Sequence, residues 1–143
     1  MRAIAIITQA GFAAICGWIA AFLGGLDGLI ASLMIFICAD YITGVTRAIL
    51  QKKLSAYKAW RGTCRKVMTF ILVGVAFTVD RYVIGGGQFI RDAVIFFFMG
   101  SEGISLLENA AGIGLPLPPK LKFILSQLHG ERDDKHEKKC EKR

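Results

Sequence analysis

The stretch Leu26–Val67 decides the fold, and it reads LDGLIASLMIFICADYITGVTRAILQKKLSAYKAWRGTCRKV. After Leu26, Asp27 and Gly28 comes an uncharged apolar run over residues 29–38, and Asp40 is the one acid between this run and Arg47. The following segment holds seven basic residues and no acid: Arg47, Lys52, Lys53, Lys58, Arg61, Arg65 and Lys66. An apolar run with a purely basic exit is typical of a membrane helix whose exit is anchored on the cytoplasmic side.

The rest of the composition agrees with a membrane protein. The chain has 143 residues, of which 54% are hydrophobic, and four apolar runs reach or approach the roughly 20 residues that span about 30 Å of hydrocarbon. The formal net charge is +7, concentrated in residues 47–66 and 120–143. In a soluble protein such clusters would suggest nucleic acid, but beside membrane helices they favour contact with anionic headgroups, with no nucleic-acid partner.

We therefore predict an all-α integral membrane protein with three to four transmembrane helices, four being favoured. The expected spans are residues 3–23, 29–50, 67–84 and 93–113, and the first is interpreted as a retained helix, not as a signal peptide. A proline-rich break at residues 115–119 precedes an amphipathic helix over 119–129. Residues 1–129 would form one domain, and 130–143 a charged, disordered tail.

Charge also predicts the topology. With the basic segment inside, both termini are cytoplasmic, and residues 24–28 and 85–92 form short outer connections. An arrangement of three crossings, with the first or the last segment not spanning, stays open. Within the basic segment, Tyr57 and Trp60 favour a short interfacial helix, although an ordinary polar loop is the simpler alternative.

Two sets of residues are candidates for contacts between helices. Small residues at fourfold spacing predict a close helix-packing face in the first segment: Ala13, Gly17, Ala21 and Gly25. Polar residues inside the other apolar segments predict a pore lining or an oligomer interface: Asp40, Thr43, Asp80, Ser101, Glu102, Ser105, Glu108 and Asn109. A single short chain can hardly shelter so many polar groups from lipid, so we expect self-association. Asp80 has an alternative, a charge at the membrane interface.

Signatures of catalysis are missing from the sequence. There is no Walker loop, no GxSxG and no HExxH. The four cysteines show no CxxC spacing, and His129, His136 and Cys140 fall in the charged tail. We predict no enzymatic activity, no cofactor and no metal.

Several blocks of this sequence resemble the toxin-secretion/phage-lysis holin family. They are GGLDGL at residues 24–29, ADYITG at 39–44, KKLS at 52–55, DAVIFF at 92–97, SEGISLLEN at 101–109 and GLPLP at 114–118. The likeness covers residues 20–129. The sequence departs from the family pattern at Ser101, where relatives often have Asn before the Glu, and over residues 57–64.

The resemblance implies a small phage or prophage protein of the bacterial cytoplasmic membrane. Such holins accumulate as homo-oligomers and then form large lesions, through which a muralytic endolysin reaches the cell wall without needing direct contact with the holin. The resemblance also implies that some relatives export toxins instead. Two alternatives stay open: a small oligomeric ion channel or proton-coupled transporter, and a regulatory membrane partner such as an anti-holin.

Overall fold

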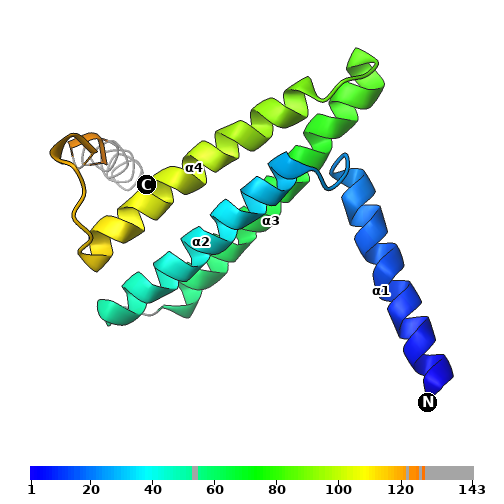
Figure 1. Ribbon diagram of the computed structural model, residues 1–143, viewed down its shortest axis with the longest axis horizontal. Helices are drawn as coiled ribbons and strands as arrows, with labels where there is room; N and C mark the ends of the chain where they lie inside the picture. Colours follow the sequence, from blue (N-terminus) through cyan, green and yellow to red (C-terminus); the bar gives the residue numbers. More distant parts are fainter. Residues whose placement is uncertain (53–54, 122, 126, 128–143) are drawn as a thin grey trace, which may run out of the picture. The chain divides into compact units, whose positions relative to one another are not determined.

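The computed structural model describes residues 1–52, 55–121, 123–125 and 127. Within these residues the chain forms four long α-helices, further helical residues after position 118, and no strand. The helices are α1 (Arg2–Phe22), α2 (Gly28–Leu50), α3 (Ala56–Val79) and α4 (Phe89–Ile113), and a turn of π-helix, η1 (Asp80–Ile84), continues α3 (Figure 1). The prediction of an all-helical chain is confirmed.

Helices α1 and α2 have nearly the predicted bounds, whereas α3 and α4 begin earlier than expected. Ser55 is extended, with φ −133°, and α3 starts at the next residue. Alanine, lysine and arginine are good helix formers, so the basic segment continues the helix without a break. Tyr57 and Trp60 consequently lie on the first turns of α3, and not on a separate interfacial helix or in a loop. The start of α4 at Phe89 shortens the second predicted outer connection.

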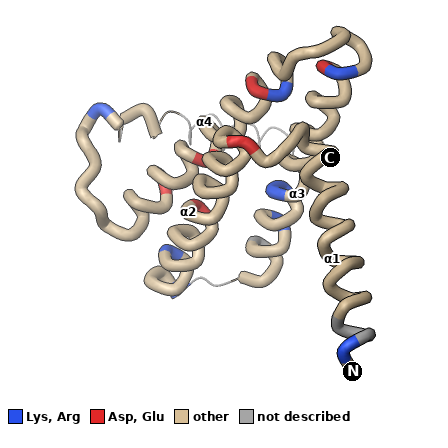
Figure 2. The backbone as a smooth tube through the Cα atoms, turned by 45° about the vertical axis from the view of Figure 1, so that its right-hand side comes forward, with Lys and Arg blue, Asp and Glu red and all other residues tan. Residues whose placement is uncertain are grey.

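Among the residues that the structure describes, two helices are long and apolar enough to cross a membrane by length and composition. They are Gly28–Leu50 and the continuous helix Ala59–Ile84, and Ile6–Phe22 is a shorter apolar helix. In Figure 2, α1 carries charge only near its start, and acids lie within α2 and α4. These observations support a membrane protein whose polar groups must find partners along the helices.

The chain divides into two compact units. Unit 1 consists of Met1–Cys38 and Ser55–Ser101, and unit 2 of Ala39–Leu54 and Glu102–Arg143. Unit 1 has one apolar core. Its buried members are Leu23, which follows α1, Ile30 and Leu33 of α2, Val73 of α3 and Ile95 of α4. Phe22, at the end of α1, lies against Gly74 of α3. A Cβ added at Gly74 would overlap the ring of Phe22. A glycine is thus required where the two helices meet.

The connections in unit 1 depend on glycines in the left-handed region. Gly24 and Gly25, at φ +84° and +104°, turn the chain from α1 into α2. A side chain at Gly24 would also meet the ring of Phe77 and the guanidinium of Arg91. Gly85, Gly86 and Gly87 all have positive φ and form the connection from η1 towards α4.

Unit 2 contains the second part of α2, the second part of α4 and the C-terminal segment. Gly114, at φ +98°, ends α4. Residues 119–121, 123–125 and 127 are helical, and Leu125 is buried. The amphipathic helix predicted over 119–129 is therefore present where the structure describes it, and the predicted tail 130–143 lies outside the described residues.

Candidate functional site

The first candidate site surrounds Arg91, a fully buried cation on the first turn of α4. Its Nη1 donates to Asp27 Oδ2 at 2.7 Å, to Gln88 Oε1 at 2.9 Å and to Asp92 Oδ1 at 3.0 Å. Its Nε donates to the carbonyl of Leu23 at 2.6 Å, and its Nη2 to the carbonyl of Gly25 at 3.4 Å. A buried guanidinium needs such acceptors, since its desolvation would otherwise be very unfavourable. We call these residues the Arg91 clasp.

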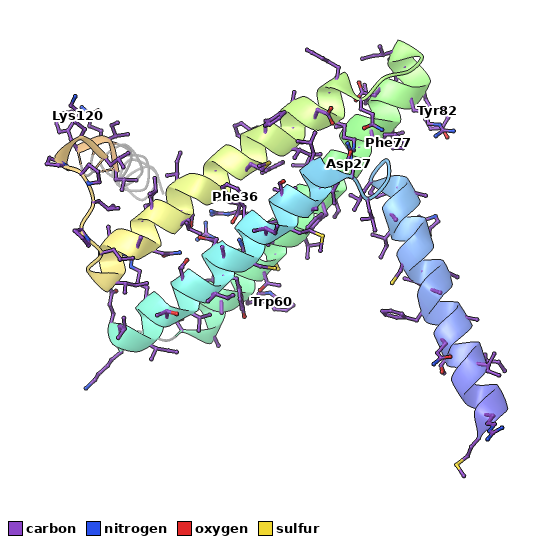
Figure 3. All side chains as sticks on the ribbon, in the orientation of Figure 1. Asp27, Phe36, Trp60, Phe77, Tyr82 and Lys120 are labelled. Atoms are coloured by element: carbon purple, nitrogen blue, oxygen red, sulfur yellow. The ribbon has the colours of Figure 1, made fainter. Side chains whose placement is uncertain are left out.

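Asp27 has two roles in this clasp. Its Oδ1 accepts from the backbone N–H of Ile30 at 3.0 Å and caps the N-terminus of α2, and its Oδ2 pairs with Arg91. The hydrogen bond from Arg91 is the largest effect on this carboxyl and lowers its pKa below the ordinary value of 3.8. One carboxylate therefore joins the start of α2 to the start of α4. Figure 3 labels Asp27 beside the start of α2.

Asp80 is bonded to the backbone of the same turn of α4 that carries Arg91. Its side chain is fully buried, and its carboxylate accepts from the backbone N–H groups of Ile90 at 3.1 Å and Arg91 at 2.8 Å. These are orphan donors of the first turn of α4, so Asp80 caps that helix from the η1 turn. In a single chain Asp80 is thus placed inside the protein, and not at a lipid or pore surface.

The second candidate site is a polar seam between the parts of α2 and α4 that form unit 2. The Nδ2 of Asn109 donates to Asp40 Oδ1 at 3.0 Å and lies 3.4 Å from the Oγ1 of Thr43. Thr43 in turn donates to the carbonyl of Ala39 at 2.9 Å. Three of the predicted polar residues are therefore brought together within one chain. Contrary to our expectation, a single copy does offer Asp40 a partner.

The seam continues towards the ends of the two helices. The Nη1 of Arg47 donates to Asn109 Oδ1 at 3.5 Å, and the Nε2 of Gln51 donates to the carbonyl of Gly112 at 3.3 Å. A Cβ at Gly112 would overlap the side chain of Arg47. The seam therefore ends at the bond from Gln51 to the last turn of α4.

The remaining predicted polar residues differ in burial. Ser101 is exposed in unit 1, Glu102 is buried in unit 2, and Ser105 and Glu108 are half-buried there. Within the described residues, an added Cβ at Gly17 would meet no atom within 4 Å. Gly25 lies beyond the end of α1, in the α1–α2 connection with φ +104°, so the predicted ladder does not extend to it. Ala13 and Ala21 are exposed. The predicted packing face is thus open in one copy.

The anchoring bases lie around the start of α3 and the end of α2. Lys52, Arg61 and Arg65 are exposed, and Arg47 and Lys66 are half-buried. Tyr57 and Trp60 are also exposed beside them, and Trp60 projects from α3 in Figure 3. Lys53 and the side chain of Lys58 lie outside what the structure describes.

Sequence reasoning missed the Arg91 clasp, because residues 88–92 were interpreted as a loop. Two signals point to it. Arg91 is followed by Asp92, and Asp27 stands within the GGLDGL block between two apolar helices. Among the described residues there is no group of His, Cys, Asp and Glu that could hold a metal ion. The two polar clusters thus join helices, and their chemistry is that of hydrogen bonds and ion pairs.

Two apolar helices of spanning length among the described residues, with polar side chains paired between helices, fit an α-helical membrane protein. Residues 17–130 match the model of the bacteriophage holin family. The chain belongs to the bacteriophage holin family, which confirms the resemblance seen in its sequence blocks.

Relatives match the chain over most of their length, and one of them is named a probable holin. A probable holin of Bacillus phage phi105 is 32% identical over 82% of this chain and 87% of its own. The protein Lmo0128 of Listeria monocytogenes is 37% identical over 90% of this chain and 91% of its own. A 14.9 kDa protein encoded in the nagH 3' region of Clostridium perfringens is 36% identical over 76% and 83%. No solved structure matches the chain.

Proposed function

We propose that this chain is a holin that self-associates in the cytoplasmic membrane of a bacterium and opens large, non-selective lesions. Its membership of the bacteriophage holin family over residues 17–130 carries this proposal, together with the likeness to a probable phage holin. A folded endolysin, or a toxin, would cross through the lesion without binding the holin. Loss of the permeability barrier and of the cell wall together would lyse the host.

We infer four crossings with both termini in the cytoplasm, and the contacts between α2 and α4 support the part of this topology that concerns α2, α3 and α4. In unit 1, Asp27 at the start of α2 pairs with Arg91 at the start of α4. In unit 2, Gln51 just beyond α2 bonds to Gly112 near the end of α4. The two helices therefore begin on one side of the membrane and end on the other. The basic residues around the end of α2 and the start of α3 favour the cytoplasmic side for that end.

Exposed surfaces support self-association and contact with lipid. Large apolar side chains are exposed along α1, including Phe12 at 71% and Trp18 at 70%. In a bilayer, small residues let such a helix approach another closely, and Ala13 and Gly17 are open for this. At the start of α3, Arg61 and Arg65 lie beside exposed aromatic rings and would contact anionic headgroups. A lesion would then be lined by polar residues of many copies.

Release from vesicles of defined lipid composition tests this function. The purified full-length protein is reconstituted into vesicles of phosphatidylethanolamine and phosphatidylglycerol that hold fluorescent dextrans of increasing size and a small dye. A holin releases all dextrans up to the size of a folded enzyme, with the same time course. Escape of protons or the small dye alone would indicate a selective channel or transporter. No release of any cargo would favour a regulatory partner.

A further inference from the structure

The Arg91 clasp joins the two connections of unit 1 that lie at the same end of its helices. Its acceptors at Leu23, Gly25 and Asp27 belong to the α1–α2 connection, and those at Gln88 and Asp92 to the start of α4. Gln88 adds a bond of its own, from Nε2 to the carbonyl of Gly24 at 3.4 Å. One cation therefore holds the first turn of α4 against the α1–α2 connection.

Separating α4 from the buried core of unit 1 requires the bonds of the Arg91 clasp to break. Ile95, one turn along α4 from Arg91, packs in the buried cluster with Ile30, Leu33 and Val73. Separating α4 from α2 at this level would pull Arg91 away from Leu23 and Asp27. An arginine left in an apolar environment without these acceptors is strongly destabilising. Movement of α4 is therefore coupled to the hydration of the guanidinium.

One side of the clasp is exposed. The guanidinium is fully buried, whereas the side chains of Asp27 and Asp92 are 39% and 37% exposed. Both carboxylates can exchange their bonds to Arg91 for bonds to water, so opening needs no step in which the carboxylates lose all partners. The nearby chain can also move, since the connection before α4 contains three glycines in the left-handed region and follows a π-helical turn.

From these relationships we propose that the Arg91 clasp is a latch: it holds the chain in a closed form, and lesion formation requires it to open. This rests on the proposed holin function. The latch assigns to Arg91 a positioning role, since it would fix α4 before the lesion forms and would be hydrated afterwards. It predicts that a covalent bond across the clasp blocks release, whereas a bond within one side of it does not.

Reversible cross-linking of two cysteine pairs tests the latch. Cys16 and Cys38 are first replaced by Ala, and Cys64 and Cys140 by Ser. The clasp pair is Asp27→Cys with Gln88→Cys, which joins the two connections. The control pair is Gln88→Cys with Asp92→Cys, which lies within one connection and the helix that follows it.

The two pairs are matched because each removes two of the three side-chain acceptors of Arg91 Nη1. Each is treated with a short bifunctional thiosulfonate, purified as the cross-linked monomer and reconstituted with dextran. We expect the clasp pair to lose dextran release when cross-linked and to regain it on addition of dithiothreitol. The control pair should release dextran in both states.

Each other result contradicts the latch in its own way. If the cross-linked clasp pair releases dextran as fast as its reduced form, the clasp is a static brace. If the control cross-link blocks release as well, the block does not come from joining the connections. If the wild type and both reduced pairs release nothing, the holin function itself fails, and the latch falls with it.

Discussion

Asn109 of α4 donates a hydrogen bond from its Nδ2 to the Oδ1 of Asp40 on α2, over 3.0 Å. Sixty-nine residues separate these two positions in the chain, and each lies on a helix that is mainly apolar. The amide nitrogen donates and the carboxyl oxygen accepts, so the pair is complementary. Thr43 and Arg47 extend the contact along the same face of α2.

Replacing Asn109 by Leu should weaken unit 2. The carboxylate of Asp40 would lose an amide donor, and Arg47 would lose its acceptor. Hydrogen bonds between membrane helices contribute on average about 0.6 kcal/mol and at most about 1.7 kcal/mol, so we expect a loss near the upper end. Thermal unfolding of the purified protein in detergent measures it. The control is Ser101→Ala, at an exposed position on the same helix. Equal midpoints for the two variants would contradict the role given to the seam.

Gly74→Ala should detach the end of α1 from α3. The added Cβ overlaps the ring of Phe22, which stacks on Trp18 with ring centroids 5.9 Å apart. In a Trp60→Phe background, displacement of Phe22 should change the emission of Trp18, now the single tryptophan. The matched control is Gly100→Ala on α4, where a Cβ meets no atom within 4 Å. If both alanine variants keep the emission of the parent, Phe22 does not pack on Gly74.

The bond from Arg91 to Asp27 should make the fold sensitive to acid. The pKa of Asp27 is lowered in the folded chain, chiefly by this hydrogen bond. Its stabilising contribution is therefore present above the ordinary value of 3.8 and is lost as the pH falls through the lower folded pKa. Unfolding midpoints of the wild type and of Asp27→Asn, measured from about pH 6 to about pH 2, should converge at the acid end. A constant gap between the two curves would exclude this linkage.

Labelling of single cysteines tests the four-crossing topology. Cys64 is exposed near the start of α3 and is predicted to face the cytoplasm. With the other cysteines replaced, a membrane-impermeant maleimide added to intact cells should label it only after permeabilisation. Leu26→Cys, at an exposed position in the α1–α2 connection, should be labelled in intact cells. Labelling of Cys64 from outside would reverse the proposed orientation.

The apolar runs were sufficient to predict the helices, because their length and composition are local properties. A short separate helix around Tyr57 and Trp60 was predicted, but its continuity with α3 was missed, since a run of bases was expected to interrupt the helix although its residues are good helix formers. The polar residues on α2 and α4 were predicted individually. Their pairing was not, because which helix faces which depends on the tertiary fold. Asp80 and Arg91 show this most clearly. Their burial is decided by the η1 turn and by the α1–α2 connection, which no pattern of spacing reveals.

The central claim, that this chain opens lesions wide enough for an enzyme, is tested most directly in growing bacteria. The protein is induced alone, or together with a muralytic enzyme that accumulates in the cytoplasm without an export signal, and the culture density is followed. We predict growth arrest with either induction, and abrupt lysis only when the muralytic enzyme is present. The account would be contradicted if the cells keep growing with an intact membrane potential although the protein is confirmed to accumulate in the membrane.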